Sequence, residues 1–212
     1  MKYKYVFLLG RPGCGKSALY RELEGRILES GQAKTFERVD DFPKLWAALL
    51  RDDALEKEGK DRLYTRRTDK GEPRLTSDDL FNVILKEVAS DVLKIDKPDH
   101  MIFIEFARSN YVEALQNFDR SILDQCIVIY MEVGFEICWA RNVARHGAAI
   151  AANGDDHLVP RAEMERIYLH DDRDAFVQYM QDQDIPIVVV NNEADGEEHL
   201  REQVDELVKH LF

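Results

Sequence analysis

Residues 10–17, with the sequence Gly-Arg-Pro-Gly-Cys-Gly-Lys-Ser, satisfy every fixed position of the pattern G-x-x-x-x-G-K-[S/T]. This pattern constrains the fold strongly, because it cradles an anion only where a strand runs into a helix. Its three glycines let successive backbone N–H groups point into one concavity. We predict a nucleotide site in which Lys16 reaches the terminal phosphates and Ser17 ligates Mg²⁺. The predicted nucleotide-binding residues are Gly10, Arg11, Pro12, Gly13, Cys14, Gly15, Lys16, Ser17 and Ala18.

The segments on either side of this loop have the patterns that it needs. Residues 3–9 are apolar and β-rich, as a buried strand should be, and the run ends at Gly10. After the loop, Leu19, Leu23 and Ile27 recur at intervals of four, which is typical of a helix that ends near Gly31. The order is therefore strand, loop, helix, and the N-terminus of the helix adds a favourable dipole beneath the phosphates.

Predicted strands and helices alternate along the rest of the chain, without an internal repeat or a long linker. This order predicts an α/β fold with a mainly parallel sheet, and 212 residues fit a single domain. Further strands are predicted over 35–39, 101–104, 127–131 and 185–190, and helices from Pro43, from Thr76 as N-cap, over 135–145, from Pro160 and over 197–211. Residues 51–75 are polar and poorly periodic, which predicts a mobile surface excursion, and residues 146–159 form a glycine- and alanine-rich loop.

Acidic residues follow two of the predicted strands, at the sheet edge where ligands bind in such folds. Asp40 and Asp41 end the second strand, and one of them is expected to orient an acceptor hydroxyl or to hold Mg²⁺ through water. Strand alternation admits at most one of the two, and Asp40 is favoured because it follows the strand directly. Helix capping before Pro43 is the alternative. Glu105 is predicted to contact Mg²⁺ through water and Arg108 to bind the acceptor or a phosphate, with a structural Glu105–Arg108 ion pair as the alternative.

Basic residues elsewhere are candidates for phosphate and acceptor contacts. Arg141 and Arg145 lie one helical turn apart and can close over the γ-phosphate, unless they simply form a solvated helix face. Arg66 is a candidate contact for an anionic acceptor, with a solvated loop as the alternative. The predicted catalytic residues are thus Lys16, Asp40, Arg141 and Arg145, the acceptor-binding residues are Asp41, Arg66, Glu105 and Arg108, and the metal-binding residues are Ser17 and Glu105.

Composition limits the other classes of partner. Twenty-nine basic and 41 acidic side chains give a net charge of −12, which argues against nonspecific nucleic-acid binding and against an anionic membrane surface. No apolar run has membrane-spanning length, and residues 6–9 are too short for a signal-peptide core, so we expect a cytoplasmic protein. We expect it to be a monomer or a homodimer.

The three cysteines suggest neither a disulfide set nor a metal cluster, and the histidines have no metal-ligand spacing. Reduced thiols are therefore expected. Cys14 lies beside a helix N-terminus, which favours its thiolate, so inhibition by oxidation of this residue is an open alternative.

The loop resembles that of adenylate-kinase-type proteins, which carry Gly-x-Pro-Gly-x-Gly-Lys. Glu105-Phe106-Ala107-Arg108-Ser109 resembles the acidic-plus-arginine segment that nucleoside and nucleotide kinases have after their third strand. The resemblance implies a P-loop NTPase three-layer sandwich, with a five-stranded parallel sheet flanked by helices. It also implies a helical acceptor-binding insertion at about 42–97 and a short lid at about 140–161.

This chain departs from the adenylate kinase pattern at two places. It has Lys16-Ser17-Ala18 where those kinases have Lys-Gly-Thr, and it lacks their Gly-Pro-Arg turn after the third strand, which argues against AMP as the acceptor. The absence of an N-K-x-D motif disfavours a signalling GTPase.

Together these features predict a phosphotransferase that moves the γ-phosphoryl group of ATP·Mg²⁺ to a small-molecule acceptor, with a nucleoside or nucleotide favoured. The alternative is a nucleotide-dependent regulatory or interaction protein, in which ATP orders the lid and phosphoryl transfer is slow or absent.

Overall fold

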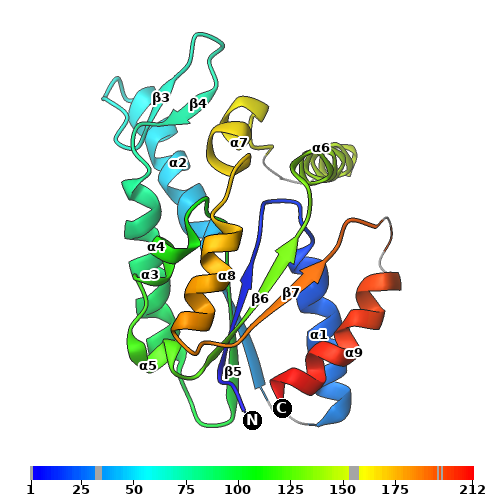
Figure 1. Cartoon of the computed structure of the whole chain (residues 1–212). Coiled ribbons are helices and arrows are strands. Elements are labelled where there is room, and N and C mark those ends of the chain that lie inside the picture. The colour runs from blue at the N-terminus through cyan, green and yellow to red at the C-terminus, as the bar shows by residue number, and fades with distance from the viewer. Residues whose placement is uncertain (1, 32–34, 153–157, 195, 197) are drawn as a thin grey trace.

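The computed structural model describes residues 2–31, 35–152, 158–194, 196 and 198–212. Its centre is a five-stranded sheet in the order β2-β5-β1-β6-β7, in which every neighbouring pair is parallel (Figure 1). The strands of this sheet are β1 (Tyr5–Leu9), β2 (Thr35–Asp40), β5 (His100–Phe106), β6 (Cys126–Glu132) and β7 (Ile187–Asn191). This confirms the predicted five-stranded parallel sheet.

Helices cover both faces of the sheet and give three layers (Figure 1). Side chains of α1 (Lys16–Ser30) and α9 (Glu198–Leu211) pack on one face. The other face is covered mainly by α3 (Asp79–Ile95), α4 (Tyr111–Leu115), α5 (Arg120–Leu123) and α8 (Arg173–Asp182). The predicted flanking of the sheet by helices is therefore also confirmed.

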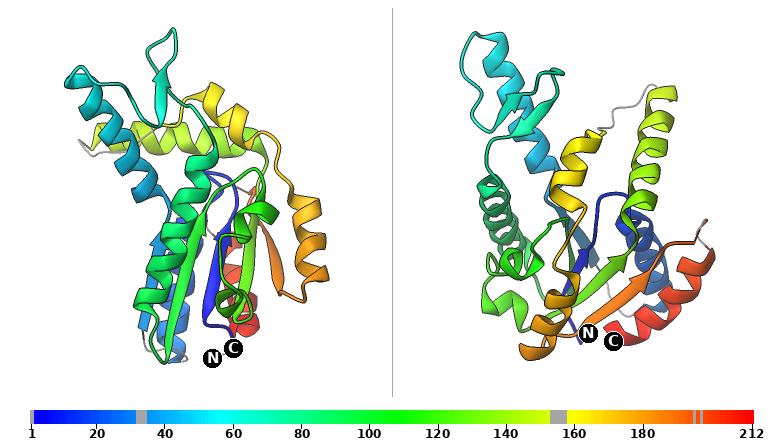
Figure 2. Two further views of the ribbon diagram at one scale, coloured as in Figure 1. Left: turned by 90° about the vertical axis from the view of Figure 1, so that its left-hand side faces the viewer. Right: turned by 45° about the horizontal axis from the view of Figure 1, so that its top comes forward.

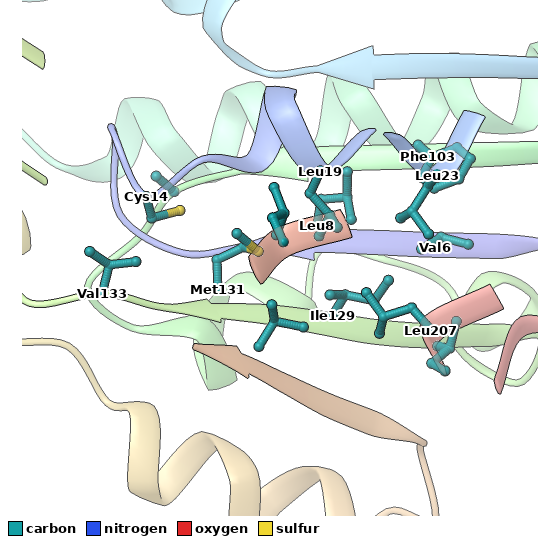
Figure 3. Packing of buried hydrophobic residues seen from close by; sticks show 14 of the residues in the cluster. Val6, Leu8, Cys14, Leu19, Leu23, Phe103, Ile129, Met131, Val133 and Leu207 are labelled. Atoms are coloured by element: carbon teal, nitrogen blue, oxygen red, sulfur yellow. The ribbon is translucent and has the colours of Figure 1, made fainter. Parts of the chain in front are cut away.

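Strand β1 is fully buried, because it lies between β5 and β6 with helices on both sides. Its side chains alternate between the two halves of the core: Val6 and Leu8 pack toward α1 and α9, whereas Phe7 and Leu9 pack toward α3 and α8. Figure 3 shows the first of these halves, with Leu8 beside Leu19 and Met131. This packing fixes the carboxyl end of β1, the central strand. The glycine-rich loop therefore starts in the middle of the row formed by the carboxyl ends of the strands.

The segment between residues 51 and 75, predicted as a mobile surface excursion, contains regular elements. Helix α2 (Phe42–Lys57) continues well into it, and β3 (Thr65–Arg67) pairs with β4 (Pro73–Leu75) as an antiparallel hairpin. Asp52 is fully buried and accepts hydrogen bonds from the backbone N–H groups of residues 63, 64 and 65, at 2.7 to 3.3 Å. A single buried carboxylate on α2 thus holds the start of the hairpin by hydrogen bonds, although this part of the sequence lacks a periodic pattern of hydrophobic residues.

Several helix boundaries differ from the predicted ones. Helix α3 begins at Asp79 with Asp78 as its N-cap, so Thr76 is not the N-cap. Helix α6 (Phe135–Ala151) extends past residue 145 into the predicted loop, while residues 153–157 of that loop and residue 197 lie outside the described part of the chain. Among the described residues, no helix is both long and apolar enough to cross a membrane.

Three elements surround the sheet edge at which β1 ends. Figure 2 shows α6, α7 (Arg161–Tyr168) and the β3–β4 hairpin grouped around this edge, while both chain termini lie at the opposite end of the molecule. Residues of the candidate site are therefore supplied by segments far apart in the sequence.

Candidate active site

A cavity of about 490 Å³ opens at the carboxyl edge of the sheet, beside the glycine-rich loop. It is bounded by the loop and α1, by the ends of β2 and β5, by α6 and by Tyr168 at the end of α7. Twelve of the residues predicted for the site line it: Pro12, Gly13, Gly15, Lys16, Ser17, Ala18, Asp40, Asp41, Glu105, Arg108, Arg141 and Arg145.

The backbone of the loop requires glycine at Gly10, Gly13 and Gly15, whose φ angles are 137°, 85° and 104°. Space is restricted too, since a Cβ on Gly13 would lie 2.4 Å from the carbonyl oxygen of Cys138. Gly15 is the N-cap of α1 and has no side chain to satisfy the first N–H groups of the helix. The helix N-terminus is therefore open toward the cavity, in the arrangement that binds phosphate.

Lys16 is the first residue of α1 and is only 7% exposed. Its Nζ donates to the carbonyl oxygens of Gly10 at 2.8 Å and Arg11 at 3.0 Å. Burial lowers the pKa of Lys16, but the acidic groups around it outweigh burial and raise the pKa overall. The side chain is thus a cation held against the loop.

Arg11 and Cys14 support the loop from outside the cavity. The Arg11 guanidinium donates to the carbonyl oxygens of Tyr168 at 2.7 Å and Val133 at 3.1 Å, and it pairs with Asp171 at 3.0 Å. Cys14 is fully buried, and burial raises its thiol pKa. The expectation that the helix N-terminus favours a Cys14 thiolate is therefore wrong, because desolvation has the larger effect.

Asp40 and Asp41 both line the cavity, whereas strand alternation predicted at most one. The alternation stops because β2 ends at Asp40, and Asp41 has a helical backbone that begins the turn into α2. The capping alternative applies in part to Asp40, whose Oδ1 accepts from the backbone N–H of Phe42 at 3.0 Å. Asp41 is the more buried of the two, at 7% exposure.

Arg108 pairs with Asp41 and not with Glu105. Its Nη1 lies 2.5 Å from Asp41 Oδ2, and its guanidinium lies over the ring of Phe81, 4.4 Å from the centroid. Burial raises the pKa of Asp41, and the attraction of Arg108 offsets this only in part. Asp41 is thus a buried carboxylate with an increased affinity for a proton, next to a cation that faces the same cavity.

Arg38 is a cavity residue that the sequence analysis did not identify. Its Nη2 lies 3.1 Å from Ser17 Oγ, 2.9 Å from Asp40 Oδ2 and 2.7 Å from Glu105 Oε2. A sequence signal existed, because positions 38 and 40 share one face of β2 by strand alternation. Burial raises the pKa of Glu105, and the cations Lys16 and Arg38 work against this increase.

The remaining predicted arginines differ in where they lie. Arg141 donates to the carbonyl oxygens of Asn192 at 2.7 Å and Ala194 at 2.9 Å, which connects α6 to the segment after β7. Arg145 donates to Asn142 Oδ1 at 3.0 Å. Arg66 is exposed on the β3–β4 hairpin and is not among the described residues that line the cavity.

Asn142 and Asn192 are two further residues that the sequence analysis missed. Asn142 Nδ2 donates to the carbonyl oxygen of Pro12 at 2.9 Å, and Asn192 Nδ2 donates to that of Cys14 at 2.7 Å. Both side chains are buried and fix the loop from α6 and from the end of β7. Neither belongs to a recognisable motif, so no sequence signal pointed to them.

Solved structures with the same fold include two that align over nearly the whole chain. The Mycobacterium tuberculosis APS kinase CysC, in complex with AMPPNP and APS, matches with a TM-score of 0.52 and 13% identity, covering 99% of this chain and 98% of the kinase. The protein APE1195 matches with a TM-score of 0.53 and 16% identity, over 100% of this chain and 98% of its own. No protein-family model and no curated protein matches the sequence. The chain therefore has the fold of a P-loop small-molecule kinase.

Proposed function

We propose that this protein is an ATP-dependent phosphotransferase that moves a γ-phosphoryl group to a hydroxyl of a small-molecule acceptor. The observation that carries the proposal is the composition of one cavity, which joins a phosphate-binding loop to a buried carboxylate–arginine pair, Asp41 and Arg108. The loop suits the donor and the pair suits an acceptor, so both halves of a transfer reaction are present.

The donor half rests on the loop amides, Lys16 and the N-terminus of α1. These groups are held by hydrogen bonds within the protein, so they can stabilise the charge of the transferring phosphoryl group with little reorganisation. Ser17, Asp40 and Glu105 carry the oxygen atoms that Mg²⁺ prefers, and their contacts with the Arg38 cation support a site for positive charge. Ser17 would hold the ion and the carboxylates its water ligands, and bound Mg²⁺ would neutralise phosphate charge.

Among the described residues, no group of three or more His, Cys, Asp or Glu side chains is arranged to hold a metal.

The acceptor half rests on Asp41 and Arg108. A general base must accept the proton of the acceptor hydroxyl, and the raised pKa of Asp41 brings it closer to the working range of such a base. Asp40 is the second candidate for this role, although its carboxylate already accepts from Arg38 and Phe42. Arg108 can orient an anionic group on the acceptor.

The chemistry of the cavity walls favours a nucleoside or nucleotide as the acceptor. Phe42, Leu45, Phe106 and Tyr168 add apolar and aromatic surface next to the Asp41–Arg108 pair, which suits a planar ring. The neighbouring APS kinase structure, which holds AMPPNP and APS, supports a site for one nucleotide and one small acceptor. Arg141 and Arg145 would act on the γ-phosphate from α6, which requires Arg141 to leave its carbonyl partners.

The test is ADP release from ATP·Mg²⁺ in the presence of pooled nucleosides, nucleoside monophosphates, sugars or small hydroxy acids. The Lys16→Ala variant serves as the blank. Release that depends on one pool, and that the variant lacks, would support the kinase and name its acceptor class. Tight ATP binding without release from any pool would instead favour a nucleotide-dependent regulatory protein.

A further inference from the structure

One nitrogen of Arg38 joins three oxygen atoms that come from three different elements. Nη2 lies within 3.1 Å of Ser17 Oγ, at the start of α1, of Asp40 Oδ2, at the end of β2, and of Glu105 Oε2, on β5. The cluster is partly enclosed, since the Arg38 side chain is 26% exposed and that of Glu105 is 9% exposed. The guanidinium thus compensates two carboxylates and donates to the hydroxyl of the phosphate-binding loop.

The same three oxygens are the ones proposed to receive Mg²⁺ with the nucleotide. Ser17 Oγ would offer a lone pair to the ion, and the two carboxylates would accept hydrogen bonds from its water ligands. A guanidinium and a divalent cation that share these oxygens at hydrogen-bonding distance repel each other strongly, because the site is partly desolvated. They cannot both hold the cluster.

We infer, on the basis of the proposed function, that Arg38 competes with Mg²⁺ for this cluster and must leave Ser17 when Mg²⁺·nucleotide binds. The residue thereby holds the metal-binding oxygens together and sets the concentration of Mg²⁺ at which the site fills.

The surroundings of Arg38 provide a path for this movement. The backbone of Arg38 is fixed by pairing with Phe103 in the sheet, so only the side chain needs to rotate. Its guanidinium already lies 5.5 Å from the centroid of the Tyr20 ring, and that ring offers a cation–π surface that can hold the charge when it leaves the oxygen cluster. The Arg38 Nε is buried and has no hydrogen-bond partner among the described residues, so the present geometry leaves part of the guanidinium unsatisfied.

The test measures Mg²⁺ binding and not turnover. Wild-type protein is saturated with AMPPNP in EDTA and then titrated with Mg²⁺, and the midpoint is compared with those of Arg38→Met and Arg38→Gln. Loss of a competing hydrogen bond to charged groups should lower the Mg²⁺ midpoint by about tenfold in both variants. Metal-free AMPPNP should bind them more weakly than wild type, because two carboxylates lose their compensating cation. Melting temperatures establish that each variant is folded.

Arg21→Met is the matched control, because Arg21 also lines the cavity and the substitution removes the same charge. A general change in field would move the midpoint of this control as far as that of Arg38→Met, and such a result would overturn the inference. An unchanged or increased Mg²⁺ requirement in the folded Arg38 variants would overturn it as well. If wild-type protein fails to bind AMPPNP with or without Mg²⁺, the proposed function itself fails, and the competition inferred from it fails too.

Discussion

Asp41 and Arg108 form a buried ion pair with 2.5 Å between Oδ2 and Nη1, although 67 residues separate them in the sequence. The pair forms because β2 and β5 are neighbours in the sheet and both end at the same edge. Arg108 also donates to the backbone carbonyl oxygen of Ala107 at 2.6 Å, which holds the guanidinium in place. One charged pair therefore lines the cavity and connects two strand ends.

The Asp41→Asn substitution should remove most turnover without weakening nucleotide binding. Loss of a general base typically lowers the rate by about 10²- to 10⁴-fold, while AMPPNP affinity should stay within about twofold because Asp41 does not belong to the loop. Steady-state kinetics and a binding titration on the same preparation measure the two effects. Asp40→Asn is the comparison variant, and a larger loss of turnover in that variant would assign the base to Asp40.

The pH dependence of turnover should report the buried position of Asp41. Because burial raises its pKa, kcat/KM should increase with pH through a value above the ordinary carboxyl pKa of about 3.9, as the base loses its proton. Stability should change with pH in the opposite direction to turnover. Because the pKa of Asp41 is higher in the folded than in the unfolded protein, Asp41 contributes to stability at acidic pH, and this contribution is lost as the pH rises through the folded-state pKa. A pH–rate profile from which Asp41→Asn fails to remove the acidic limb would contradict the assignment.

The sequence predicts those parts of the molecule whose signals are local. The glycine-rich loop and the strands β1, β5 and β6 follow from short patterns, since a parallel strand covered on both faces is a continuous apolar run. The pair Asp41–Arg108 and the contacts of Arg38 depend on which strands are neighbours, and no single segment encodes that order. The β3–β4 hairpin was missed because its organising group, Asp52, lies on a different element.

Asp52 should be essential to the hairpin. It is fully buried, and its Oδ2 accepts from both the backbone N–H and the Oγ1 of Thr65 at 2.7 Å. Asp52→Ala leaves the two buried donors of Thr65 without this acceptor and should lower the free energy of unfolding by about 1–3 kcal/mol for each of them, as measured by urea denaturation.

Asp53→Ala is the control for that experiment, because Asp53 is partly exposed and because its partners Arg62 and Arg67 each keep an ion pair with Glu56. It should cost no more than about 1 kcal/mol. Equal effects of the two substitutions would show that Asp52 does not organise the hairpin.

The cysteines should react slowly in the folded protein. Cys14, Cys126 and Cys138 are all buried, and burial raises the pKa of each thiol, to about 12 for Cys126 and Cys138. Iodoacetamide near neutral pH should therefore modify all three thiols in urea but leave them largely unmodified in the native state, as read by mass spectrometry. Rapid modification of Cys14 in the native protein would contradict this expectation. It would support the alternative that oxidation of Cys14 inhibits nucleotide binding.

Two glycine substitutions should have opposite effects on the protein. Gly13→Ala places a Cβ 2.4 Å from a backbone oxygen and 2.8 Å from Asn142 Nδ2, at a φ of +85° that L-residues rarely adopt. The loop must then deform, so AMPPNP binding should be lost. The free energy of unfolding should fall by about 1–3 kcal/mol or more, which is typical of local backbone strain.

Gly25→Ala lies within α1, and no atom lies within 4 Å of the added Cβ. That variant should gain about 0.5–1 kcal/mol from helix propensity and bind AMPPNP like wild type. Thermal denaturation and AMPPNP titration of both variants measure these effects, and retention of nucleotide affinity in Gly13→Ala would show that the loop is not the phosphate site.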